Sequence, residues 1–179
     1  MFYNESIKNG EIIPKPWFNY GFVSFLERRV RPDMAVFEYG AGYSTLWWQN
    51  QVSKVFSVDN DLNWVNHLKE EISANVDLRF IAVETGGLYC QAARDIDILF
   101  DVIVVDGRDR VNCAKVAVEK LKPDGVIIFD NSQRDYYREG IEEIKSKGFK
   151  EIQFSGIASM TYVESFTSIL YKADNCFQI

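Results

Sequence analysis

The sequence predicts an α/β fold: a single Rossmann-like, doubly wound sheet of seven strands, mostly parallel with the last strand antiparallel. Short runs rich in Val, Ile and Phe alternate with longer amphipathic segments, which is the pattern of repeated strand–helix–strand units. The runs are continuously hydrophobic, as expected for strands that are buried on both faces. Acidic residues follow several of the runs, at the carboxyl ends of parallel strands, where such sheets bind ligands.

The first element expected is a helix at residues 15–29, because Pro14 and Pro16 suit a helix start and Pro32 follows its end. This helix belongs to a helical N-terminal segment (1–33) that precedes the α/β core (34–179) in a single domain, residues 1–179. The continuous hydrophobic runs predict strands at residues 34–39, 55–58, 78–83, 101–105 and 126–129.

The amphipathic segments between these runs predict helices at residues 44–50, 61–73, 110–121 and 136–147. Ser44 and Asp61 suit the N-cap positions of the first two. The final two strands are expected at residues 149–155 and 166–172, joined by a loop at 156–165. Since this loop leaves no room for a crossover helix, the two strands should pair antiparallel.

Composition limits the partners and the compartment. The formal net charge is −6 and no cluster of Lys and Arg stands out, which argues against nucleic acid and favours a small-molecule substrate. Three scattered cysteines indicate free thiols in a reducing compartment, and no segment has the pattern of a signal peptide or a membrane span. We therefore expect a cytoplasmic protein with no membrane partner. A homo-oligomer stays open, because a chain without a cap domain could borrow site walls from a second copy.

The segment VFEYGAGYSTLWW (residues 36–48) joins the first strand to the next helix and contains Gly40 and Gly42. A Gly-x-Gly turn here is typical of nucleotide sites, although Thr45 stands where the dinucleotide fingerprint has its third glycine. Glu38 would repel the pyrophosphate of NAD and attract the ammonium and sulfonium groups of S-adenosylmethionine. Asp59, at the end of the next strand, suits ribose hydroxyls in either cofactor. The sign of the charge therefore favours S-adenosylmethionine.

These residues, together with DVIVVDG (101–107) and LKPDGVIIFDN (121–131), resemble the successive motifs of class I S-adenosylmethionine-dependent methyltransferases over residues 34–172. KPWFNYGFVSFLE and VDGRDRVNCA are similar to segments of a bacterial group of small methyltransferases. In some relatives an N-terminal helix folds over the cofactor, which residues 15–20 would do here. The resemblance implies cofactor-binding roles for Glu38, Gly40, Gly42, Tyr43, Ser44, Thr45, Asp59, Asn60 and Asp106.

The resemblance places Glu38, Gly40 and Gly42 around the methionine part of the cofactor, Asp59 at the ribose and Asn60 near the adenine. Asp106 would face the methyl group and is the catalytic candidate. The single histidine, His67, is expected inside a helix and away from the strand ends.

Asp106, Asp130 and Asn131 resemble the ligand set of cation-dependent O-methyltransferases, which implies a bound Mg²⁺ or Ca²⁺. Structural hydrogen bonding at the strand ends is the alternative. Arg108 and Arg110 follow on the same loop and either bind an acidic substrate group or are solvated.

The leading hypothesis is methyl transfer from S-adenosylmethionine to a small-molecule acceptor, with O-methylation favoured. One alternative is a non-catalytic nucleoside-binding protein of the same fold, and another is an NAD-dependent oxidoreductase. Tighter binding of NAD than of S-adenosylmethionine would identify the last.

Overall fold

The main sheet is mostly parallel and its last strand is antiparallel, as the sequence predicts. The computed structural model describes residues 7–8, 11–12, 14–158 and 163–179. In this part of the chain the main sheet has seven strands in the order β5-β4-β3-β6-β7-β9-β8. The strands are β3 (Ala35–Tyr39), β4 (Lys54–Asp59), β5 (Val76–Phe80), β6 (Phe100–Val105), β7 (Leu121–Asp130), β8 (Lys150–Ile157) and β9 (Glu164–Tyr171). Strands β3 to β7 pair in parallel, and β9 runs antiparallel between β7 and β8.

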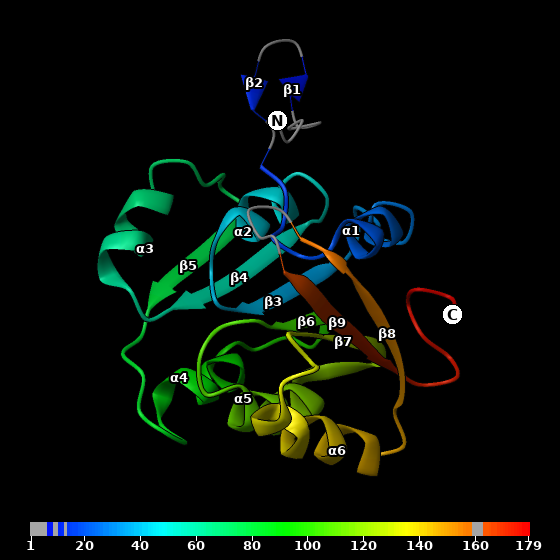
Figure 1. Ribbon diagram of the computed structural model, residues 1–179. Helices are drawn as coiled ribbons and strands as arrows, with labels where there is room; N and C mark the ends of the chain where they lie inside the picture. Colours follow the sequence, from blue (N-terminus) through cyan, green and yellow to red (C-terminus); the bar gives the residue numbers. More distant parts are fainter. Residues whose placement is uncertain (1–6, 9–10, 13, 159–162) are drawn as a thin grey trace.

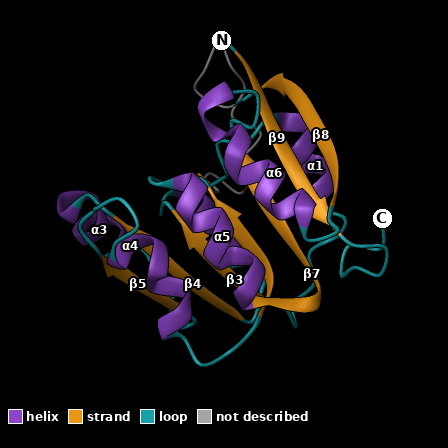
Figure 2. Cartoon of the chain, turned by 90° about the horizontal axis from the view of Figure 1, so that it is seen from below, coloured by secondary structure: helices purple, strands orange, loops and turns teal. Residues whose placement is uncertain are grey.

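Helices cover both faces of the sheet, as Figures 1 and 2 show. One face carries α1 (Tyr20–Leu26), α2 (Tyr43–Trp48) and α3 (Leu62–Leu68). The other carries α4 (Leu88–Gln91), α5 (Arg110–Lys120) and α6 (Arg138–Ser146), with the short 3₁₀ helices η1 (Ala92–Asp95) and η2 (Asp135–Tyr137).

Each central strand contributes to two hydrophobic cores, because successive side chains point to opposite faces. In β3, Val36 joins the core beneath α1 and α2, whereas Phe37 joins the core beneath α4, α5 and α6. All five residues of β3 are buried. This double burial explains why the strand runs are hydrophobic without alternation.

The helix expected at residues 15–29 is shorter at both ends. It begins after Asn19, whose side chain accepts the N–H of Phe22 and donates to the carbonyl of Phe154 on β8. Asn19 is therefore both the N-cap and a tie to the sheet, so the residues before it stay outside the helix. A small antiparallel hairpin, β1 (Ile7–Lys8) with β2 (Glu11–Ile12), precedes this segment and projects from the body in Figure 1.

The bounds of other helices and loops also differ from the predicted ones, because they depend on tertiary contacts that the sequence pattern does not show. The helix expected at 61–73 ends at Leu68, and the short helices α4 and η1 were not predicted. The loop expected at 156–165 is narrower, because β8 continues to Ile157 and β9 starts at Glu164. Residues 159–162 of that loop lie outside the described residues. Among the described residues, no helix has both the length and the apolar character needed to cross a bilayer.

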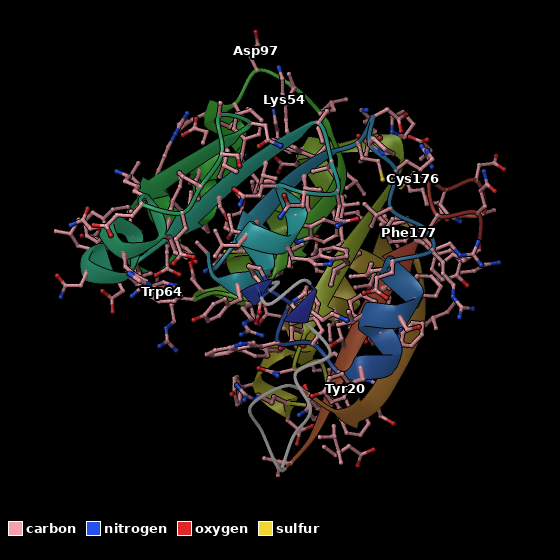
Figure 3. The ribbon with its side chains drawn as sticks, turned by 90° about the horizontal axis from the view of Figure 1, so that it is seen from above. Tyr20, Lys54, Trp64, Asp97, Cys176 and Phe177 are labelled. Atoms are coloured by element: carbon pink, nitrogen blue, oxygen red, sulfur yellow. The ribbon has the colours of Figure 1, made fainter. Side chains whose placement is uncertain are left out.

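The C-terminal tail packs against α1. Phe177 is buried, its ring centroid lies 6.0 Å from that of Phe25, and its carbonyl accepts from Arg29. Figure 3 shows Phe177 beside this helix. The peptide N–H of Cys176 also donates to the carbonyl of Asp124 in β7, so the tail joins α1 to the sheet.

Candidate cofactor site

A cavity of about 510 Å³ lies at the carboxyl ends of β3, β4 and β6. This volume is within the range of about 300–1,000 Å³ that small-molecule and cofactor sites have. Its wall is formed by Trp17, Gly40, Ala41, Gly42, Tyr43, Ser44, Asp59, Asn60, Asp61, Trp64, Asp106, Gly107, Arg108 and Arg110. Of the residues predicted for the cofactor, all but Glu38 and Thr45 therefore meet at one cavity.

Gly40 is required by a contact between two turns. Its φ is +94°, a conformation that L side chains rarely adopt, and a Cβ there would lie 2.6 Å from the Cα of Gly107. Gly107 belongs to the turn after β6, so the turns that follow β3 and β6 touch backbone to backbone. Gly42 is different: its backbone is extended, and a Cβ would meet nothing nearer than the Oγ of Ser44 at 4.0 Å.

The backbone amides of the glycine turn already have acceptors within the protein. Gly40 donates to the carbonyl of Val58 at 2.8 Å, and Ala41 donates to Oδ2 of Asp59 at 3.1 Å. Gly42 donates to Oγ1 of Thr45 at 3.0 Å. A pyrophosphate bound at such a turn needs free N–H groups, and these three are engaged.

Glu38 and Thr45 lie behind the turn and not on the cavity wall. Oε2 of Glu38 accepts from the hydroxyls of Thr45 and Ser57, whereas its Oε1 has no hydrogen-bond partner among the described residues. Burial raises the pKa of Glu38 to about 7, against the opposing effect of its hydroxyl donors. Glu38 therefore does not line the cavity, and its predicted contact with the cationic part of the cofactor stays a prediction. Its carboxyl accepts from Thr45, which in turn accepts the amide of Gly42, so Glu38 supports the glycine turn from behind.

Asp59 lies on the wall and also organises it. Besides the amide of Ala41, it accepts the amide of Asp61 on Oδ1 at 2.8 Å. Burial raises its pKa, and these amide donors act in the opposite direction. A carboxylate has about four acceptor positions, so two remain for ligand hydroxyls. Asn60 follows directly on the same wall.

Three aromatic side chains line the cavity. The ring centroids of Trp17 and Tyr43 are 5.9 Å apart, and those of Tyr43 and Trp64 are 6.0 Å apart. The indole N–H of Trp64 donates to the carbonyl of Ala41 at 2.9 Å, and Figure 3 shows Trp64 on α3. Sequence reasoning did not identify Trp64, although its position three residues after the N-cap Asp61 was a usable signal. Trp47 and Trp48 are buried in the core and do not line the cavity.

Arg110 links the ends of β6 and β7. Its guanidinium donates to a carboxylate oxygen of Asp106 at 2.9 Å and to the carbonyls of Asp106, Gly107 and Asp130. It also lies 4.9 Å from the centre of the Tyr137 ring. Only 7% of its side chain is exposed, so this arginine is part of the framework of the site.

Asp106 and Asp130 are neighbouring carboxyl groups beside Arg110. Burial and the charge of Asp130 raise the pKa of Asp106 well above its usual value, and Arg110 opposes that shift. Burial likewise raises the pKa of Asp130, whose Oδ1 accepts from the hydroxyl of Thr167 at 2.6 Å. Asp106 lies on the cavity wall, whereas Asp130 is buried behind it.

The structure does not support the predicted metal site at Asp106, Asp130 and Asn131. The guanidinium of Arg110 lies among these residues and donates to Asp106 Oδ1 at 2.9 Å and to Asn131 Oδ1 at 3.4 Å, so two of the three proposed ligands are already engaged by a protein cation. No group of three or more His, Cys, Asp or Glu side chains in the described ranges is arranged to hold a metal ion. His67 is exposed on α3 and does not line the cavity, as its predicted position implied.

Comparisons by structure give consistent results. Precorrin 8W decarboxylase from Methanobacterium thermoautotrophicum has a TM-score of 0.64 at 18% identity, over 89% of this chain and 92% of that chain. Precorrin-6y C5,15-methyltransferase from Geobacter metallireducens has a TM-score of 0.61 at 16% identity, over 84% and 86% of the two chains. The N-methyltransferase NodS from Bradyrhizobium japonicum, in complex with S-adenosyl-L-homocysteine, has a TM-score of 0.58 at 13% identity, over 83% and 84%.

These likenesses show the fold: the chain has the seven-stranded fold of class I methyltransferases, as its motifs predict. No family model matches the chain, and no curated protein matches it by sequence.

Proposed function

We propose that this chain transfers the methyl group of S-adenosylmethionine to a small-molecule acceptor by O-methylation. The observation that carries the proposal is the glycine turn, in which the amides of Gly40, Ala41 and Gly42 are all engaged by protein acceptors. Such a turn offers little to a pyrophosphate and suits a nucleoside cofactor without phosphate. The fold neighbours, named as methyltransferases, support the same cofactor.

The wall has groups for each part of this cofactor. Asp59 retains acceptor positions for the ribose hydroxyls, and Asn60 with the rings of Tyr43 and Trp64 would hold the adenine. Asp59, Asp61 and Asp106 make this side of the cavity acidic, which suits the cofactor's ammonium and sulfonium charges. The cofactor supplies an activated methyl group, and the protein supplies its orientation.

Asp106 is the residue that would receive the acceptor's proton. It lies on the wall, and its raised pKa makes its carboxylate a stronger base than an ordinary aspartate. Arg110 holds one of its oxygens at 2.9 Å and thereby sets the direction of the carboxyl group. Because the pKa is raised, turnover should increase with pH as Asp106 loses its proton.

Calorimetric titration tests the cofactor. We expect S-adenosylhomocysteine to bind at least about tenfold more tightly than NAD⁺, a difference of about 1.4 kcal/mol. Tighter binding of NAD⁺ would contradict the proposal.

Turnover is then measured as formation of S-adenosylhomocysteine with a panel of hydroxylated small molecules. We expect the Asp106→Asn variant to lower turnover by about 10²–10⁴-fold. Tight cofactor binding with no turnover across the panel would favour the non-catalytic nucleoside-binding alternative.

A further inference from the structure

Arg108 is a cation on the cavity wall without a counter-ion. The residue is exposed and lines the same cavity as Asp59 and Asp106. Within the described part of the chain its guanidinium has no hydrogen bond or ion pair, and its backbone N–H lies 3.5 Å from the Tyr89 hydroxyl. A charged group on the wall of a cavity, with no protein partner, is available to a ligand.

Arg108 differs from Arg110, two residues later. The sequence leaves both arginines the same two alternatives, binding an acidic substrate group or being solvated, and the structure shows that their surroundings differ. Arg110 is buried and its donors are used by Asp106, Gly107 and Asp130. Among the described residues no ion pair joins Arg108 to the neighbouring carboxylate of Asp109, whose oxygens accept from the amide of Gly86 and from the side chain of Asn112. Arg108 is thus an arginine on the cavity wall whose guanidinium is not held by a carboxylate.

The cavity therefore has two ends of different charge. The turn after β4 contributes Asp59 and Asp61, whereas the turn after β6 contributes Arg108 and Asp106, and the carboxylate of Asp106 is already paired with Arg110. Arg108 suits an anion, because a guanidinium donates two parallel hydrogen bonds to a carboxylate or phosphate. That anion is either the carboxylate of the cofactor or an acidic group of the acceptor, and ligand titrations distinguish the two.

The wall also offers an exposed aromatic face. Trp17 remains 53% exposed although it lines the cavity and packs near Tyr43, whereas Trp47 and Trp48 are buried. Large aromatic surfaces left open in a cavity are typical of sites that hold planar apolar ligands. Because the adenine is assigned to Tyr43 and Trp64, the exposed ring of Trp17 is left for the acceptor, which should therefore combine a flat apolar body with a negative group.

We propose that the methyl acceptor is a small aromatic anion whose carboxylate or phosphate is bound by Arg108. This proposal rests on the function proposed above and adds the substrate class. It assigns Arg108 to substrate binding and Arg110 to the framework of the site.

Matched ligand pairs test the proposal on protein saturated with S-adenosylhomocysteine. The pairs are 4-hydroxybenzoate with 4-hydroxybenzamide, 4-hydroxycinnamate with its amide, and phenyl phosphate with phenol. In calorimetric titrations we expect the anion of at least one pair to bind about tenfold or more tightly than its neutral counterpart. In the Arg108→Gln variant this ratio should fall to about one. Arg28→Gln is the matched control, because Arg28 is an exposed arginine outside the cavity wall.

Three outcomes would overturn the proposal. The first is that no anion in the panel binds more tightly than its neutral partner. The second is that the Arg108→Gln and Arg28→Gln variants lose the preference equally, which would indicate a general charge effect. The third is that Arg108→Gln weakens the binding of S-adenosylhomocysteine instead, which would assign Arg108 to the carboxylate of the cofactor. The titration of S-adenosylhomocysteine into the wild-type protein is recorded first, so failure of the proposed function is seen separately.

Discussion

At the scale of a residue, Glu38 connects the cofactor turn to the stability of the protein. Its pKa is raised from 4.5 to about 7 by burial, so the folded protein binds this proton more tightly than the unfolded chain. The stabilisation is complete below about pH 4.5 and is lost as the pH rises to about 7. A shift of this size corresponds to about 3 kcal/mol. We expect the Glu38→Gln variant, in chemical denaturation from pH 4.5 to 8, to lack this part of the pH dependence.

The Glu38→Gln variant is compared with the wild type because Asp59, Asp106 and Asp130 also have raised pKa values. These three residues are present in both proteins, so the difference between the two proteins isolates Glu38. Equal slopes of unfolding free energy against pH in the two proteins would show that Glu38 is not the titrating group. The sequence shows that an acidic residue precedes the glycine turn, but it does not show where the carboxyl group of Glu38 points. The spacing before Gly40 is compatible with a carboxyl group on the cavity wall and with one buried behind the wall. The hydrogen bonds from Thr45 and Ser57 hold it in the buried position.

At the scale of an element, the turn after β3 uses its two glycines for different purposes. We expect Gly40→Ala to destabilise the protein by about 2 kcal/mol or more, because its methyl group would collide with the Gly107 turn at a strained φ. Gly42→Ala should change stability by less than about 1 kcal/mol, since its backbone is extended and the space is open. The added methyl group would enter the cavity, so the Gly42→Ala substitution should weaken the binding of S-adenosylhomocysteine. Denaturation and calorimetry of both variants check this, and a stable Gly40→Ala protein would contradict the contact.

The strands and the helix ends differ in how well they could be predicted. Runs such as Val102–Val105 are recognisable because double burial leaves a continuous hydrophobic signal. The start of α1 is set by a long-range bond from Asn19 to Phe154, and no local pattern contains it. The Arg110 contacts were hidden for the same reason, because Asp130 is 20 residues away along the chain. Local rules therefore predicted the carboxyl ends of β3, β4, β6 and β7 to within one residue, and most of the cavity wall, but not the end of β5 or the partners of the charges on the wall.

At the scale of the whole molecule, the C-terminal tail and the cavity lie in different parts of the fold. The C-terminal tail is anchored at Cys176 to Asp124, near the start of β7, whereas the cavity lies at the carboxyl ends of the neighbouring strands. Phe177 is 1% exposed and joins the core that contains α1 and the face of the central strands.

We expect Phe177→Ala to lower the unfolding free energy by about 3–5 kcal/mol, the usual result of deleting a buried phenylalanine. Phe80→Ala is the control, because Phe80 is 41% exposed and should lose far less. Denaturant unfolding measures both, and S-adenosylhomocysteine affinity of the folded Phe177→Ala protein should match that of the wild type. A stability loss below about 1 kcal/mol would mean that the tail is not part of the core, and a loss of cofactor affinity would mean that the two regions are coupled.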